Sequence, residues 1–164
     1  MSTRPELDAE EILRRLTARG VDFVVIGGIA AVLWGSARMT FDLDICFATD
    51  EANLQALGKV LVDLGAQLKG VDEELPLVPD ATTLRRVEML TLKTTAGELD
   101  LLARPAGAPA YDVLRKRAAR VDLGDFNILI SSLDDLITMK RAAGRTKDLA
   151  DVEELEAIRD LGPG

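Results

Sequence analysis

Residues 21–47 read VDFVVIGGIAAVLWGSARMTFDLDICF, and this stretch decides the fold class of the chain. Its first six residues are mostly apolar and β-branched, which predicts a short strand over 21–26. Gly27 and Gly28 follow directly and predict a tight turn. The apolar run at 29–34, which ends at Gly35, then predicts a short helix.

The second half of this stretch predicts a strand that carries two carboxylates on one face. Over residues 41–47, large apolar residues alternate with Asp42, Asp44 and Cys46. A period of two is typical of a strand with one buried face, so Asp42 and Asp44 project to the same side. Aspartate is depleted in strands, so this pair favours a functional role over the alternative, the solvated face of an edge strand.

Local patterns predict the remaining elements. Asp8 and Ser132 are expected to cap helices, because an acidic residue follows each of them at the third position. Helices are expected at about 8–19, 51–64, 111–119, 132–144 and 147–160, strands at 87–94 and 98–103 around a turn at 95–97, a strand pair over 121–130, and a loop over 70–83 with at most one short strand.

Strands and helices interleave along the chain, which predicts an α/β (α+β) fold with a small mixed, largely antiparallel sheet backed by helices. The 164 residues are expected to form a single domain, 1–164, with a helical C-terminal part at about 132–160. Trp34 and Cys46 are expected to be packing residues in this fold.

Composition excludes several classes of function. The chain has 20 basic and 28 acidic residues, a net charge of −8, which argues against general coating of nucleic acid. It has no histidine, so any chemistry must run without the commonest general base and zinc ligand. A single cysteine fits a reducing compartment, and the uncharged stretch 23–36 is too short to span a bilayer, so we expect a cytoplasmic protein without membrane association.

The combination of a glycine turn, an Asp-Leu-Asp strand and a later strand with Asp100 predicts a metal-dependent phosphate site. A glycine turn at a helix N-terminus favours an anion, and Asp42 and Asp44 on one face are suited to hard divalent cations. A third carboxylate from Asp100 would complete this set if its strand lies alongside. Glu98, two residues earlier on the same face, is the alternative to Asp100.

The sequence resembles the nucleotidyltransferase superfamily related to DNA polymerase β. The resemblance runs through GGIAAVLWGSARMTFDLDI at 27–45 and ELDLL at 98–102. Two further segments, GSARMT at 35–40 and LITMKRAAGRTKDLAD at 136–151, are similar to the abortive-infection and toxin–antitoxin members of that superfamily.

The resemblance implies transfer of a nucleoside monophosphate from a nucleoside triphosphate to an acceptor hydroxyl. Two Mg²⁺ ions, with Mn²⁺ as a substitute, would be the cofactors. Asp42, Asp44 and Asp100 would bind metal and act in catalysis, and the nucleotide would contact Gly27, Gly28, Ser36, Arg38, Lys140 and Asp148. The implied partners are the triphosphate, an acceptor that is a protein, a tRNA or a small molecule, and a cognate toxin or antitoxin or a second copy of the chain.

Each signal also has a simpler interpretation. The glycines can serve a tight turn alone, and Lys140, in the last turn of its predicted helix, can simply compensate the helix dipole. Two other functions remain open: a non-catalytic module that regulates a partner by binding, and a phosphate-binding metal protein that hydrolyses nucleotides without transfer.

Overall fold

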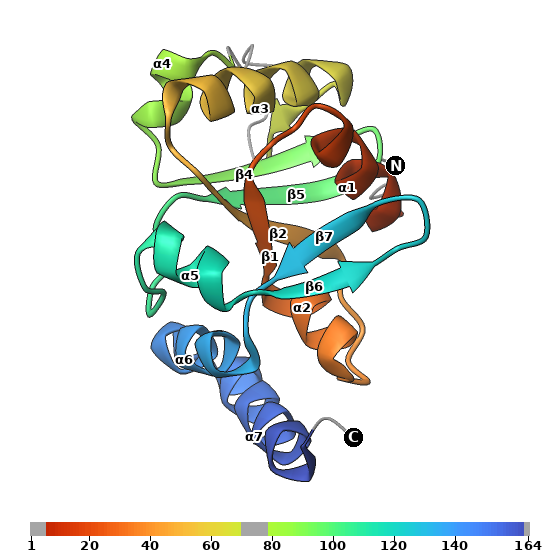
Figure 1. Cartoon of the computed structure of the whole chain (residues 1–164), viewed down its shortest axis with the longest axis vertical. Helices are drawn as coiled ribbons and strands as arrows, with labels where there is room; N and C mark the ends of the chain where they lie inside the picture. Colours follow the sequence, from red (N-terminus) through yellow and green to blue (C-terminus); the bar gives the residue numbers. More distant parts are fainter. Residues whose placement is uncertain (1–5, 70–78, 163–164) are drawn as a thin grey trace.

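The computed structural model of the chain describes residues 6–69 and 79–162. A seven-stranded sheet forms its centre, in the order β3-β4-β5-β2-β1-β7-β6 (Figure 1). The strands are β1 Phe23–Ile26, β2 Asp42–Phe47, β3 Gln67–Leu68, β4 Met89–Thr94, β5 Gly97–Leu102, β6 Ala119–Asp122 and β7 Asn127–Ile130. The β2–β5 and β1–β7 pairs are parallel and the other four pairs are antiparallel, which confirms the mixed, largely antiparallel sheet.

Helices lie on both sides of this sheet. They are α1 Ala9–Ala18, α2 Gly27–Trp34, α3 Glu51–Asp63, α4 Ala81–Arg85, α5 Tyr111–Arg117, α6 Leu133–Ala143 and α7 Thr146–Leu161. The two predicted caps are confirmed: Asp8 and Ser132 each accept a hydrogen bond from the backbone N–H three residues later, at 3.1 Å in both cases. Gly144 ends α6 in the left-handed conformation, with a φ of 67°.

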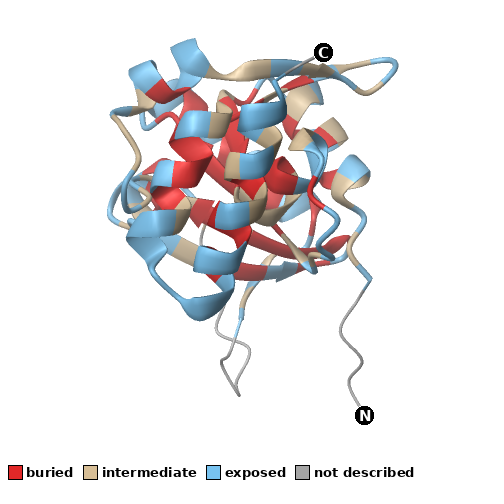
Figure 2. Cartoon of the chain, turned by 90° about the horizontal axis from the view of Figure 1, so that it is seen from below, coloured by how far each residue is buried: buried red, intermediate tan, exposed pale blue. Residues whose placement is uncertain are grey.

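The alternation along β2 separates two apolar clusters. Leu43 and Ile45 are fully buried in the main core, which also contains the inner faces of α1 and α3. Cys46 faces the other way, into a smaller cluster with Leu114 of α5 and Met139 of α6. Figure 2 shows the buried residues concentrated in the sheet and on the inner sides of the helices. Even-numbered residues of β2, Asp42 and Asp44 included, therefore point toward the side that α5 and α6 cover.

Cys46 and Trp34 are packing residues, as predicted. Cys46 is 2% exposed, and burial raises the pKa of its thiol to about 12. Trp34 is half-buried against the main core and donates from its indole Nε1 to the Ser131 carbonyl at 2.9 Å.

Several local predictions need correction. The predicted loop at 70–83 ends in a helix, α4, because Asp80 accepts from the Thr83 backbone N–H at 2.7 Å and caps it; residues 70–78 lie outside the described residues. The alternation at 41–47 predicts that Phe41 belongs to the β2 strand with its ring in the core, but Phe41 precedes β2 and is 55% exposed. The helix predicted at 111–119 ends earlier, and Ala119 begins β6.

Within the described ranges 6–69 and 79–162, no helix combines the length and the apolar character needed to cross a bilayer.

Candidate active site

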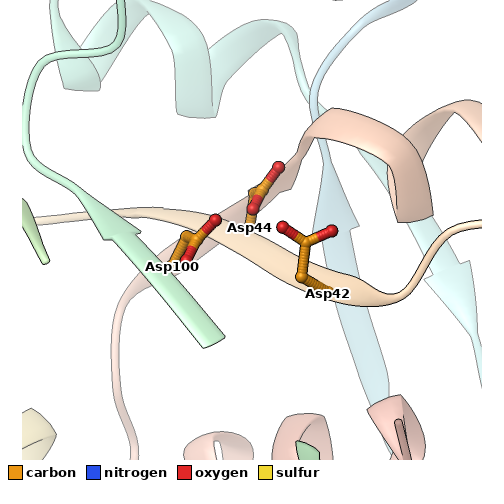
Figure 3. A group of neighbouring side chains, drawn as sticks. All are labelled: Asp42, Asp44 and Asp100. Carbon is orange, nitrogen blue, oxygen red and sulfur yellow. The ribbon is translucent and has the colours of Figure 1, made fainter. Parts of the chain in front are cut away.

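The structure brings the three predicted aspartates together. β2 lies between β1 and β5, so it is not an edge strand, and the alternative interpretation of its carboxylates as an exposed edge face is wrong. In the parallel pairing of β2 with β5, Asp44 stands directly opposite Asp100. One carboxylate oxygen from each of Asp42, Asp44 and Asp100 lies within 4.8 Å of the other two, and the three side chains point into the same space (Figure 3). Three strand-borne carboxylates at this spacing are suited to divalent cations.

Burial and mutual repulsion of the carboxylates disfavour the charged forms of Asp44 and Asp100. Burial, and then the charge of Asp42, raise the pKa of Asp44 to about 8. Burial also raises the pKa of Asp100 to about 6, and Asp42 adds to that rise. Within the described part of the chain, Oδ1 of Asp44 and Oδ1 of Asp100 are buried without a hydrogen-bond partner. Such orphaned acceptors are costly unless a cation or proton satisfies them, so the residues present fit a bound divalent cation.

Gly27 and Gly28 are required by the packing of this turn. Gly27 has a φ of +69°, and a Cβ there would lie 2.1 Å from Oδ2 of Asp44. A Cβ on Gly28 would lie 2.6 Å from Oγ1 of Thr40. Gly27 therefore allows the Asp44 carboxylate to lie against the start of α2, and Gly28 allows the Thr40 side chain to pack there as well. No side chain in the described residues caps this end of α2, which leaves its backbone N–H groups for another acceptor.

A pocket of about 420 Å³ opens beside the three carboxylates. One part of its wall is basic and comes from the segment between α2 and β2, from α6 and from the start of α7. The pocket is lined by Gly28, Ala31, Ser36, Arg38, Met39, Thr40, Phe41, Asp42, Asp44, Met89, Asp100, Leu102, Lys140, Arg145, Lys147 and Asp151. The site thus places acidic and basic groups around one cavity, an arrangement suited to a metal-bound polyphosphate.

Most of the predicted nucleotide contacts line this pocket, with two exceptions. Ser36, Arg38 and Lys140 are at its wall, whereas Gly27 lies behind Asp44 and Asp148 is fully buried. Although burial opposes ionisation, hydrogen bonds from Arg145 hold the pKa of Asp148 below its usual value. Asp148 accepts from Nε of Arg145 at 2.6 Å and lies 3.7 Å from Nζ of Lys140. Asp148 therefore supports two basic side chains, one of which, Lys140, lines the pocket wall, and its predicted contact with the nucleotide stays a prediction.

Three charged residues of the pocket lining are not assigned to the site from the sequence: Arg145, Lys147 and Asp151. The basic pair is visible in the sequence as part of a charge cluster at the start of α7, but a charge cluster alone does not show which side chains reach a pocket. Asp151 has no local signal, because its role depends on contacts with residues that lie far away in the sequence or on another helix.

Asp100 and Glu98, the two candidates for the third carboxylate, make different contacts. Glu98 lies opposite Asp42 in the β2–β5 register, and it is 7% exposed. Its carboxylate forms an ion pair with Nζ of Lys69 at 3.0 Å. In the described ranges, the group of acidic residues close enough to share a metal ion contains Asp100 and not Glu98.

Comparisons with known proteins agree with this geometry. No protein-family model and no curated protein sequence matches the chain. The solved structure of the lincosamide antibiotic adenylyltransferase LnuA, lincomycin-bound, matches with a TM-score of 0.64 at 19% identity, over 93% of this chain and 99% of LnuA. The chain has the nucleotidyltransferase fold. The prediction of this fold from the glycine turn and the Asp-Leu-Asp strand is confirmed.

Two further solved structures share this fold. ANT(2″)-Ia in complex with adenylyl-2″-tobramycin matches with a TM-score of 0.55 at 16% identity, over 93% of this chain and 92% of that one. An antigenic nucleotidyltransferase-like protein from Paracoccidioides brasiliensis matches with a TM-score of 0.57 at 18% identity, over 96% of this chain and 80% of that one. The nucleotidyltransferase fold thus extends across nearly the whole chain, α6 and α7 included.

Proposed function

We propose that this chain is a metal-dependent nucleotidyltransferase that moves a nucleoside monophosphate from a nucleoside triphosphate to an acceptor hydroxyl. The observation that carries the proposal is the cluster of Asp42, Asp44 and Asp100, with two orphaned buried oxygens, at the edge of a pocket with a basic wall. The nucleotidyltransferase fold supports it.

Asp42, Asp44 and Asp100 would hold two Mg²⁺ ions, or Mn²⁺ in their place. Such ions supply charge stabilisation at a phosphoryl centre and lower the pKa of an attacking hydroxyl. The cluster uses only hard carboxylate oxygens, which is the ligand set that these cations prefer. It also explains how a chain without histidine can support this chemistry.

In the reaction, the acceptor oxygen bonds to the α-phosphorus and the bond from that phosphorus to the bridging oxygen breaks. Pyrophosphate leaves with the bonding electrons, and the acceptor proton passes to a carboxylate, a role that we assign to Asp100. Arg38, Lys140 and Lys147 line the basic wall and would bind the departing pyrophosphate. Gly28 and the N-terminus of α2 lie beside the carboxylates and would contact phosphate oxygens.

For the acceptor we place a small hydroxylated molecule first. LnuA is described as lincomycin-bound and ANT(2″)-Ia as a complex with adenylyl-2″-tobramycin, and this chain spans nearly all of both. The segment 136–151, similar to toxin–antitoxin nucleotidyltransferases, supports the alternative of a protein or tRNA acceptor, with a cognate partner or a second copy of the chain. A non-catalytic binding module is disfavoured, because such a module is expected to lose a metal carboxylate and none of the three is missing.

The test is to incubate the chain with each of four α-labelled nucleoside triphosphates and Mg²⁺, and with one acceptor class at a time. The three classes are hydroxylated antibiotics, bulk tRNA, and a protein extract. Label on an acceptor shows transfer, label released only as nucleoside monophosphate shows hydrolysis, and intact nucleotide under all conditions contradicts the proposal.

A matched pair of variants makes this test specific for the site. Asp44→Asn should abolish transfer and leave the fold intact, because it removes one metal carboxylate. Asp63→Asn removes a carboxylate of α3 that pairs on the surface with Arg19 at 2.8 Å, and it should retain full activity. Full activity in Asp44→Asn would rule out the proposed mechanism.

A further inference from the structure

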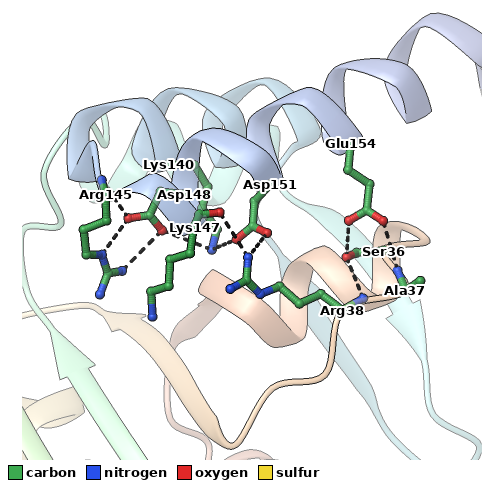
Figure 4. A network of polar contacts seen from close by, with 9 residues as sticks. All are labelled: Ser36, Ala37, Arg38, Lys140, Arg145, Lys147, Asp148, Asp151 and Glu154. Atoms are coloured by element: carbon green, nitrogen blue, oxygen red, sulfur yellow. Dashed lines mark hydrogen bonds and ion pairs between the residues drawn. The ribbon is translucent and has the colours of Figure 1, made fainter.

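One face of α7 carries three carboxylates that reach back toward the pocket. Asp148, Asp151 and Glu154 are three residues apart, so they lie along the same side of the helix. Asp148 engages Arg145 and Lys140 within the helical pair α6–α7, whereas Glu154 accepts from the Ser36 hydroxyl and from the Ala37 backbone N–H (Figure 4). The segment between α2 and β2, which leads into the metal-binding strand, is thereby tied to α7.

Asp151 lies in the middle of this row and connects the segment between α2 and β2 to helix α6. Its Oδ1 accepts from Nη1 of Arg38, which comes from the segment before β2. Its Oδ2 accepts from Nζ of Lys140 on α6 at 3.0 Å. The Asp151 side chain is 9% exposed, so both contacts are shielded from water on the carboxylate side.

We propose that Asp151 is a positioning residue that holds Arg38 and Lys140 together in the basic wall, ready for the phosphates of the nucleotide. This inference rests on the proposed function, because it assigns Asp151 a role toward the triphosphate of that reaction. Two cations that face one anionic ligand repel each other when the ligand is absent, and a shared carboxylate between them offsets this repulsion. Both side chains are also long, so fixing them in advance lowers the entropy lost on binding.

Arg38 depends most on this contact. Its side chain is 43% exposed, and among the described residues its other side-chain hydrogen bond runs from Nη1 to the Lys147 carbonyl at 3.0 Å. Lys140 is 13% exposed and has a second carboxylate, Asp148, at 3.7 Å. Loss of the Asp151 charge should therefore release Arg38 more than Lys140. The ties through Glu154 and Asp148 remain, so the fold should survive the change.

The experiment measures binding of inorganic pyrophosphate by calorimetry in the presence of Mg²⁺, and KM and kcat for the transferred nucleotide. Asp151→Asn should weaken pyrophosphate binding and raise KM by about 10-fold, while kcat at saturating nucleotide changes by less than about 3-fold. The matched control is Glu153→Gln, which removes an exposed carboxylate of the same helix and should change neither constant. Asp151→Glu keeps the charge and should restore part of the affinity.

A double-mutant cycle of Asp151 and Arg38 shows whether Asp151 acts through Arg38. Arg38→Met should weaken pyrophosphate binding by itself, and Asp151→Asn should have a smaller effect in the Arg38→Met background than in the wild type. Full additivity of the two changes would overturn the inference. Should Asp151→Asn fail to fold, Asp151→Ser is used in the same cycle, because it also removes the carboxylate that Arg38 and Lys140 share.

The outcomes separate this inference from the function on which it rests. If the wild type binds pyrophosphate and Asp151→Asn binds it equally well or more tightly, the positioning role alone is overturned. Tighter binding would identify Asp151 as a competitor of the phosphates. No pyrophosphate binding and no transfer by the wild-type chain would overturn both.

Discussion

Replacement of Gly27 by alanine tests whether the turn serves mainly to make room for a metal carboxylate. The added Cβ would lie 2.1 Å from Oδ2 of Asp44 and 3.0 Å from its carboxyl carbon. To restore an ordinary contact of about 3.4 Å, the oxygen must move by about 1.3 Å. One carboxylate oxygen from each of the three aspartates lies within 4.8 Å of the other two, so a shift of this size is a large fraction of the distances over which they could share cations.

Two separate effects are expected. The φ of +69° is strained for alanine, which should lower the free energy of unfolding by about 1–2 kcal/mol. A displacement of this size in a catalytic group should lower kcat/KM by about 100-fold, and the affinity for Mg²⁺ should fall with it. The loss of activity is separate from the loss of stability, because it arises from the displaced Asp44 carboxylate and not from the strained backbone.

Gly20 provides the control for backbone strain. It has a φ of +71°, and nothing lies within 4 Å of the position that its Cβ would take. Gly20→Ala should therefore show a similar loss in urea denaturation and keep wild-type transfer and Mg²⁺ binding. The steric reasoning is refuted if Gly27→Ala retains activity within about 3-fold of the wild type, or if Gly20→Ala loses as much activity as Gly27→Ala at the same folded fraction.

Two further predictions concern stability. In the metal-free protein the pKa values of Asp44, about 8, and Asp100, about 6, exceed their unfolded values, so the folded state holds more protons than the unfolded state and the free energy of unfolding should fall as pH rises. Urea denaturation in EDTA should show that the free energy of unfolding falls by at least about 1.4 kcal/mol between pH 5 and pH 7.5. Excess Mg²⁺, or the Asp44→Asn substitution, should make this fall smaller. A free energy of unfolding that stays constant or rises with pH in EDTA contradicts the prediction. Asn53→Ala should cost about 2–3 kcal/mol, because Asn53 is 6% exposed, accepts from the Asp22 N–H at 2.6 Å and donates to the Ala48 carbonyl at 2.7 Å. Gln55 is an exposed residue of the same helix, and Gln55→Ala should change the free energy of unfolding by less than about 0.5 kcal/mol. Equal losses of stability in both variants would refute the stabilising role of the Asn53 hydrogen bonds.

The features that sequence can predict are those with a local signature. The period of two in β2 follows from the pleat itself, so the common face of Asp42 and Asp44 can be predicted from the sequence alone. Caps at Asp8 and Ser132 are equally predictable, because a capping side chain reaches only three residues ahead. Helix α4 escapes prediction, because five residues with two buried side chains are too short to show a helical period.

Long-range partners cannot be predicted in the same way. The pattern of β5 shows a strand with Asp100 on one face, but the parallel register that sets Asp100 opposite Asp44 arises from sheet assembly. Likewise Arg38 and Lys140 are predicted from resemblance, whereas the carboxylate that joins them belongs to α7, 113 residues after Arg38. The preference for Asp100 over Glu98 stays a prediction, and the contact that bears on it, the ion pair of Glu98 with Lys69, depends on a residue 29 positions away in the chain.

The buried thiol of Cys46 has a practical consequence. It is the only cysteine of the chain, it is enclosed by the smaller apolar cluster, and its raised pKa leaves almost no thiolate at neutral pH. Cys46 should therefore react little with thiol-directed dyes and spin labels. A cysteine introduced at an exposed position of α7, such as Leu149, would report on the motion of that helix without removal of any natural cysteine.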